Sequence, residues 1–160
     1  MHCSHNGNFQ EYPGHHKDSE RIHDYPRNHY QIEMRTEKEK IFVNLSNHPS
    51  SDWGEDQLTA AQLYGRVVDI AFPAIPPEAD ERVISQMAAH YVAIVHEMTK
   101  DKAVTLHVMG EMTFVFRVVS QLETMGVTCL ASTTERIVHV TDAGEKISEF
   151  HFVRFRKYSS

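Results

Sequence analysis

The sequence predicts an α/β domain with a mostly parallel sheet, about four parallel strands in the order 2-1-3-4, followed by a C-terminal antiparallel β-hairpin. Three observations predict this fold class. Short apolar runs, typical of strands buried on both faces, alternate with longer segments of helical spacing. Glycine or proline stands at most junctions between them. Near its end the chain holds two extended runs around an Asp-Ala-Gly turn, as hairpins do.

Residues 1–38 differ from the remainder of the chain, because they are rich in His, Asn, Asp, Glu and Lys and show no apolar period. Such a segment buries too little apolar surface to fold. We therefore expect a disordered His-rich tail at 1–38 and one domain at 39–160. Translation from Met34 is an alternative, since the residues after it lead directly into the first strand. The tail histidines lack the spacing of a compact zinc motif, so no metal site is assigned to them.

The domain elements follow one another in a regular order. Lys40–Leu45 predicts the first strand, and residues 46–54 form a polar loop after it. A helix is expected from Glu55 to Tyr64, where Gly65 provides a stop signal. The next apolar run, Val67–Phe72, predicts the second strand.

The second half of the domain repeats this alternation. Ala79–Met98 is amphipathic and predicts a helix, and Ala103–Val108 predicts a central buried strand. Gly110 allows the tight turn into a third helix, Glu111–Thr124. Val127–Ala131 predicts the fourth strand.

The polar stretch 132–136 is expected to be the loop that leaves the fourth strand. After it, Ile137–Thr141 and Lys146–Arg156 predict the two strands of the hairpin.

Composition excludes several classes of function. The chain has 160 residues and a net charge of -6, which argues against a broad basic face for duplex DNA or anionic membrane. Its two cysteines, Cys3 and Cys129, are far apart and predict neither a disulfide framework nor a paired-cysteine zinc site. No apolar run approaches the roughly 18 residues of a membrane span. A cytoplasmic protein without a cofactor is the simplest expectation.

The strand ends predict where a ligand binds. Parallel α/β sheets hold ligands beyond the carboxyl ends of their strands, at the point where strand order reverses. Here that point lies between the first and third strands, where the segments 46–51, 109–113 and 132–136 converge. These are the most polar strand exits in the chain.

Two residues on these exits are candidates for catalysis. His48 suits proton transfer near neutral pH, although it could simply cap the turn before Pro49. Arg136 suits a phosphate because its planar fork matches two oxygens, although it could pair with Glu135 or face solvent. His107, inside an apolar strand, is expected to be a hydrogen-bonded core or strand-face residue.

The remaining ligand-binding candidates offer a hydroxyl, an amide, a carboxylate or a free backbone N–H: Ser46, Asn47, Ser50, Ser51, Gly110, Glu111, Thr113, Ser132, Thr133 and Thr134. Helix capping explains several of these equally well, and a carboxylate such as Glu111 is favoured at a helix N-terminus in any case. Trp53 could stack a base or cover the first helix. The chain has no P-loop, dinucleotide fingerprint, nucleophile elbow or metal triad.

Four segments, NLSNHPSSDWGEDQL, HVMGEMTFVF, ASTTERIV and ISEFHFVRFRKY, together resemble small CRISPR-associated proteins with a Rossmann-like fold, related to CARF sensors and ring nucleases. The resemblance covers roughly Lys40 to Tyr158. It implies a pocket for a cyclic oligoadenylate, an antiviral second messenger, in a homodimer. It also implies metal-independent cleavage, in which a ribose 2′-hydroxyl attacks the neighbouring phosphate.

Under this resemblance His48 would transfer the proton and Arg136 would hold the phosphate. Ser46, Ser132, Thr133 and the Gly110 backbone would orient the ligand. These roles follow from the predicted loop positions, because ring nucleases share no fixed catalytic set. Two alternatives stay open: a sensor that binds the nucleotide without cleaving it, and an enzyme acting on another small anionic substrate.

Overall fold

The computed structural model describes residues 37–141 and 144–159. Most of the predicted tail lies outside this part of the chain, as do its histidines, Met34 and Cys3.

The unit is built on one five-stranded sheet with the order β2-β1-β3-β4-β5. Its first four strands are mutually parallel, and β5 pairs antiparallel with β4. The strands are β1 (Glu39–Ser46), β2 (Arg66–Asp69), β3 (Lys102–Met109), β4 (Thr128–Val140) and β5 (Lys146–Lys157). The predicted fold class is thus confirmed, and so is the strand order 2-1-3-4 with a C-terminal hairpin.

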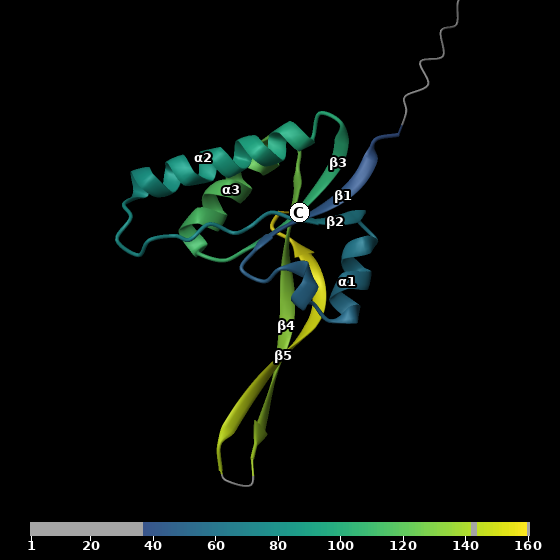
Figure 1. Ribbon diagram of the computed structural model, residues 1–160, viewed down its shortest axis with the longest axis vertical. Helices are drawn as coiled ribbons and strands as arrows, with labels where there is room; N and C mark the ends of the chain where they lie inside the picture. The colour runs from purple at the N-terminus through teal and green to yellow at the C-terminus, as the bar shows by residue number, and fades with distance from the viewer. Residues whose placement is uncertain (1–36, 142–143, 160) are drawn as a thin grey trace, which may run out of the picture. The chain divides into compact units, whose positions relative to one another are not determined.

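Helices cover both faces of the sheet (Figure 1). α2 (Glu81–Met98) and α3 (Met112–Thr124) lie on one face, and α1 (Glu55–Gln62) lies on the other. A short 3-10 turn, Ser50–Asp52, precedes α1. None of these helices is both long and apolar enough to cross a membrane.

Alternation along β1 divides the core between the two faces. Ile41, Val43 and Leu45 pack under α2 and α3, whereas Phe42 belongs to a smaller cluster with α1 and β5. All four side chains are fully buried. The next residue on the Phe42 face is Asn44, which is also buried. The sequence of β1 therefore places a polar side chain inside the sheet, directly beyond an aromatic core.

β4 differs most from the prediction. The sequence suggested that the strand stops at Ala131 and that 132–136 form a loop, but β4 continues through this segment to Val140. The cause is the pairing with β5, which supplies an antiparallel hydrogen-bonding partner to polar residues that have no apolar pattern of their own. A register shift between Thr133 and Thr134 marks a bulge in this ladder. The ligand-binding exit predicted there is thus a continuous strand (Figure 1).

β2 is shorter than predicted, because it ends at Asp69 and not at Phe72. The chain then leaves the sheet toward Pro73, whose ring removes a backbone donor. One further bond, from Ile70 N to Asn44 O (2.8 Å), holds the exit against β1.

Gly65 joins α1 to β2 in a conformation that few other residues adopt, with φ at +139°. A Cβ there would overlap the backbone carbonyl of Lys40. We expect Gly65→Ala to lower the free energy of unfolding by about 3 kcal/mol, from backbone strain plus overpacking. Gly126→Ala is the matched control, since Gly126 has φ at +80° but open space around it, and we expect a loss of about 1 kcal/mol. Urea unfolding measures both, and equal losses would contradict the role of the Lys40 carbonyl.

Candidate functional site

A cavity of about 850 Å³ opens at the carboxyl ends of β1 and β3 and beside the middle of β4. We call it the switch-point cavity, because strand order reverses between β1 and β3 at this place. Its volume lies in the range of ordinary small-molecule sites, and open α/β sheets bind ligands in this position. Ser46, His107 and Ser132 contribute polar atoms to its lining, and the loop before α1 and the strand β5 contribute aromatic rings.

Beneath the cavity, a row of polar side chains crosses the sheet. Asp69 on β2, Asn44 on β1 and His107 on β3 are direct neighbours in the strand register. Asn44 Nδ2 donates to Asp69 Oδ1 (2.7 Å), and Asn44 Oδ1 lies 2.9 Å from His107 Nδ1. His107 Nε2 lies 3.4 Å from Ser132 Oγ on β4. We call these four residues the polar row.

The hydrogen bonds of Asn44 determine which nitrogen of His107 carries the proton. Asn44 Nδ2 donates to two acceptors, Asp69 Oδ1 and the backbone oxygen of His48 (2.9 Å), so its amide orientation is set. Its Oδ1 must therefore accept, from Ser46 Oγ (2.9 Å) and from His107 Nδ1. His107 is consequently the Nδ1–H tautomer, and its Nε2 carries a lone pair.

Burial controls the charge of His107, which is only 2% exposed. Removal from water, together with the nearby His48, lowers the pKa of His107 to about 4. At the other end of the row, burial raises the pKa of Asp69. Hydrogen bonds from Ser50 and Asn44 outweigh that effect and bring this pKa below its usual value. The row therefore consists of a carboxylate, an amide and a neutral imidazole near pH 7.

The loop after β1 is held by its backbone. The backbone oxygen of His48 accepts hydrogen bonds from Asn44 Nδ2 (2.9 Å) and Trp53 Nε1 (3.2 Å), and it lies 3.0 Å from Ser46 Oγ, whose single proton it shares with Asn44 Oδ1. The His48 side chain is exposed and lines the switch-point cavity. A fixed backbone with an open imidazole is an arrangement that suits proton transfer to a bound ligand.

Aromatic rings form one side of the cavity. The half-buried Trp53 packs edge-on against His107, with ring centroids 5.5 Å apart. Phe150 and Phe152 of β5 also line the cavity, and Phe150 is 64% exposed. Exposed ring faces of this kind stack nucleobases, at about 1–3 kcal/mol for each base.

The structure brings about half of the predicted site residues to this cavity. Those that line it are Ser46, Asn47, His48, Gly110, Ser132 and Thr134. The others make structural hydrogen bonds. Ser50 donates to Asp69, and Ser51 donates to Asp52. Thr133 Oγ1 donates to the backbone oxygen of Arg154 (3.1 Å).

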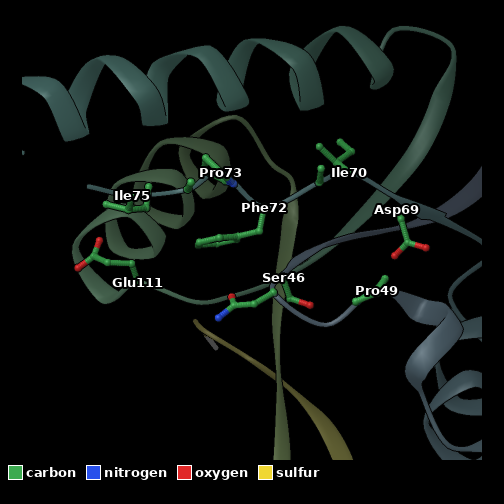
Figure 2. A pocket seen from close by; sticks show the side chains of 11 residues that line it. Ser46, Pro49, Asp69, Ile70, Phe72, Pro73, Ile75 and Glu111 are labelled. Atoms are coloured by element: carbon green, nitrogen blue, oxygen red, sulfur yellow. The ribbon is translucent and has the colours of Figure 1, made fainter. Parts of the chain in front are cut away.

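Glu111 and Thr113 take part in a helix cap. The Glu111 carboxylate accepts from Thr113 N (3.0 Å) and Phe114 N (2.8 Å) at the start of α3, and from the Thr113 hydroxyl. These bonds lower the pKa of Glu111. The N-terminus of α3 is thus satisfied by its own carboxylate. Glu111 lines a second cavity of about 600 Å³ around Phe72, which shares Ser46 and Asn47 with the first (Figure 2).

Arg136 lies beside the switch-point cavity without lining it. Its guanidinium donates to Ser148 Oγ from Nε (3.1 Å) and Nη2 (2.8 Å), and it stacks 6.0 Å above the Phe150 ring. Because Phe150 does line the cavity, Arg136 flanks its aromatic side. The arginine is held by the hairpin, since β4 extends where a loop was predicted.

The charge of the cavity is acidic. Asp52, Glu55 and Asp56 contribute to the lining, and no arginine or lysine does so among the residues that the structure describes. Gly54, the N-cap of α1, has no side chain to accept from the first N–H groups of the helix, and residues 54–57 line the cavity. An anion in this cavity would meet backbone donors, with Arg136 beyond Phe150.

Three members of the polar row were not assigned to the site from the sequence. The sequence places Asn44 and Asp69 in strands without assigning them a role, and it predicts His107 as a hydrogen-bonded core or strand-face residue, which the structure confirms. One signal was available. Each of these residues is a polar interruption in a strand expected to be buried on both faces. Within residues 37–141 and 144–159, no three His, Cys, Asp or Glu side chains gather as metal ligands would.

Comparison with known protein families gives a match. The model of the family described as "Uncharacterized protein MJ1673" matches residues 40–156, which is the α/β unit almost from end to end. No curated protein and no solved structure matches the chain.

Proposed function

The chain belongs to the uncharacterized protein MJ1673 family, and from that starting point we propose that it binds a cyclic oligoadenylate in the switch-point cavity and cleaves it as a ring nuclease. The resemblance to CRISPR-associated Rossmann-like proteins motivates the choice of ligand. The observation that carries the proposal is the composition of the cavity. Stacking rings from Trp53, Phe150 and Phe152 face hydroxyl and imidazole groups at the point of strand reversal.

In the proposed reaction the ligand supplies its own nucleophile. The ribose 2′-oxygen forms a bond to the adjacent phosphorus while the bond from phosphorus to the 5′-oxygen breaks, which leaves a 2′,3′-cyclic phosphate. His48 accepts the proton of the 2′-hydroxyl. The leaving 5′-oxygen then takes a proton, either from water or from His48, which gives back the proton that it accepted. Arg136 contacts the phosphate from beyond Phe150, and N–H groups at the start of α1 contribute further donors. No cofactor takes part in this scheme.

A second copy of the chain completes the proposed site. The ribbon of β4 and β5 exposes Val138 and Val140 on one of its faces, which gives it an apolar surface for a homodimer. A cytoplasmic location is part of the same proposal. Membrane and duplex DNA have no part in the proposal.

The direct test is incubation of purified protein with cyclic tri-, tetra- and hexa-adenylate, with and without EDTA, followed by chromatography of the products. We expect linear or cyclic-phosphate-ended fragments in the presence of EDTA. His48→Ala should slow cleavage by about 100-fold or more while part of the binding survives. Arg136→Ala should weaken both, and Arg154→Ala, an exposed arginine on the same hairpin, is the matched control.

One observation favours a sensor that binds without cleaving. The described lining of the cavity holds three carboxylates and no cation, so it offers little charge stabilisation for a phosphorane-like transition state. If the protein is a sensor, binding of a cyclic oligoadenylate would raise the melting temperature of the protein, and the ring would be recovered intact. Intact rings without any shift in melting temperature would contradict both forms of the proposal.

A further inference from the structure

We propose that His107 is the specificity-determining acceptor of the switch-point cavity, and that its Nε2 atom accepts a hydrogen bond from a neutral donor of the bound nucleoside, a hydroxyl or an amine. The inference deepens the proposed function and rests on it for the class of ligand. It concerns a residue that the reaction scheme above leaves without a role.

The first step is the direction of the hydrogen bonds. Both protons of the Asn44 amide go to fixed acceptors, the Asp69 carboxylate and the backbone oxygen of His48. Asn44 Oδ1 is thereby an obligatory acceptor, and it requires the Nδ1–H of His107. The polar row therefore turns the lone pair of Nε2 toward the cavity and Ser132.

The second step is that the lone pair of Nε2 is only weakly hydrogen-bonded within the protein. The group that faces Nε2 is the Ser132 hydroxyl, at 3.4 Å, which is long for a hydrogen bond. The same hydroxyl lies 2.9 Å from Met109 Sδ, a sulfur that has no proton to give. One hydroxyl proton cannot serve both acceptors fully. A ligand donor near the Ser132 side of the cavity would complete the bonding of Nε2.

The third step is that His107 acts as a hydrogen-bond acceptor and not as a general base or a cation. His107 is surrounded by rings, with Phe42 stacked at 6.0 Å and Phe155 at 5.3 Å between centroids. An imidazolium in these surroundings would lose its hydration, and its pKa of about 4 agrees with a group that stays neutral. So low a basicity makes His107 a poor proton acceptor at pH 7, whereas its lone pair still accepts a hydrogen bond. Proton transfer is left to His48, and recognition falls to His107.

This geometry makes the affinity of the cavity depend on the group that a ligand presents to His107 Nε2. A ligand that presents a carbonyl or no polar group to Nε2 leaves a desolvated acceptor unpaired. Such a loss corresponds to roughly a 10- to 100-fold change in affinity. A ligand with a hydroxyl or an amine at this point avoids the loss.

The test compares three ligands of the ring size that binds in the assay above. They are the cyclic oligoadenylate, its 2′-deoxy form without the ribose hydroxyl, and its inosine form with a carbonyl in place of the adenine amine. Dissociation constants are measured by calorimetry for the wild type, His107→Phe and His107→Gln, and every protein also carries His48→Ala if chromatography shows that the rings are cut. His151→Phe is the matched control, because His151 lines the same cavity but is exposed.

We expect the wild type to bind the adenylate at least 10-fold more tightly than one of the two analogues, and the weaker analogue identifies the donor as hydroxyl or amine. This preference should vanish in His107→Phe, persist in His151→Phe and survive partly in His107→Gln, whose amide oxygen can accept. A purely structural role for His107 would change affinity for all three ligands alike.

Two results would overturn the inference. If the wild type binds all three rings equally, or His107→Phe keeps the preference, then His107 does not select the ligand although the proposed function stands. If no ring binds the wild type, the proposed function fails and the inference fails with it. The comparison of ligands on the wild type does not depend on the folding of any variant.

Discussion

Replacement of Asn44 by aspartate is expected to lower the free energy of unfolding by about 3 kcal/mol, although the two side chains have nearly the same shape. Asn44 is 1% exposed and donates to both the Asp69 carboxylate and the backbone oxygen of His48. A carboxylate at position 44 cannot donate, and it would place a second negative charge about one hydrogen-bond length from Asp69. Equilibrium urea unfolding at pH 7 measures the loss.

The double variant Asn44→Asp with Asp69→Asn tests whether the loss comes from this pair of residues. It restores one amide and one carboxylate across β1 and β2 in exchanged positions, and it still offers an acceptor to His107 Nδ1. We expect it to recover about half of the lost stability, because the bond to the backbone oxygen of His48 stays broken. Asn47→Asp, the same change at an exposed position in the next loop, is the control and should have little effect. A double variant no more stable than Asn44→Asp would show that the polar row is not coupled in this way.

Acidification is expected to destabilise the protein by about 3 kcal/mol between pH 6.5 and pH 4 through His107 alone. The sign follows from its lowered pKa. Above pH 6.5 the imidazole is neutral in both folded and unfolded chains and makes no contribution. Below pH 6.5 the unfolded chain gains a proton that the folded chain accepts only near pH 4, so stability falls with pH across this window and levels off beneath it.

His107→Phe supplies the comparison. This variant has no group to protonate at that position and fits among rings that already surround it. Its stability should therefore depend less on pH between 6.5 and 4 than that of the wild type. The lowered pKa of Asp69 acts below pH 3.8, because its contribution is lost as pH falls through the folded value, so the two effects are separable. Parallel stability curves for the two proteins would contradict the neutral, buried state of His107.

The fold was predictable because its elements carry strong local signals. The apolar strands around Phe42 and Leu106, separated by amphipathic helices, leave few topologies other than a parallel sheet. The extension of β4 was not predictable in the same way. Its segment from Ser132 to Arg136 has no apolar alternation, and its strand conformation depends on β5, a partner supplied later in the chain.

The location of the candidate site followed from topology, but its interior did not. The strand-exit rule placed Ser46, His48 and Ser132 at one cavity, as the structure does. It could not place Arg136, because that residue belongs to a strand and not to an exit loop. The polar row depends on strand register, which sets Asn44 beside His107 and which no local pattern in either strand reveals.

The alignment of the polar row also has a consequence for assembly of the sheet. Asn44 faces His107, while its neighbours Val43 and Leu45 face Leu106 and Val108. A slip of one residue between β1 and β3 would bring Asn44 against an aliphatic side chain and turn it toward the opposite face. His107 would then lose Asn44 as its partner, whereas an entirely aliphatic pair of strands would tolerate the slip. The buried amide of Asn44 thus selects one register of β1 against β3. The same side chain defines both the alignment of the sheet and the polar row beneath the cavity.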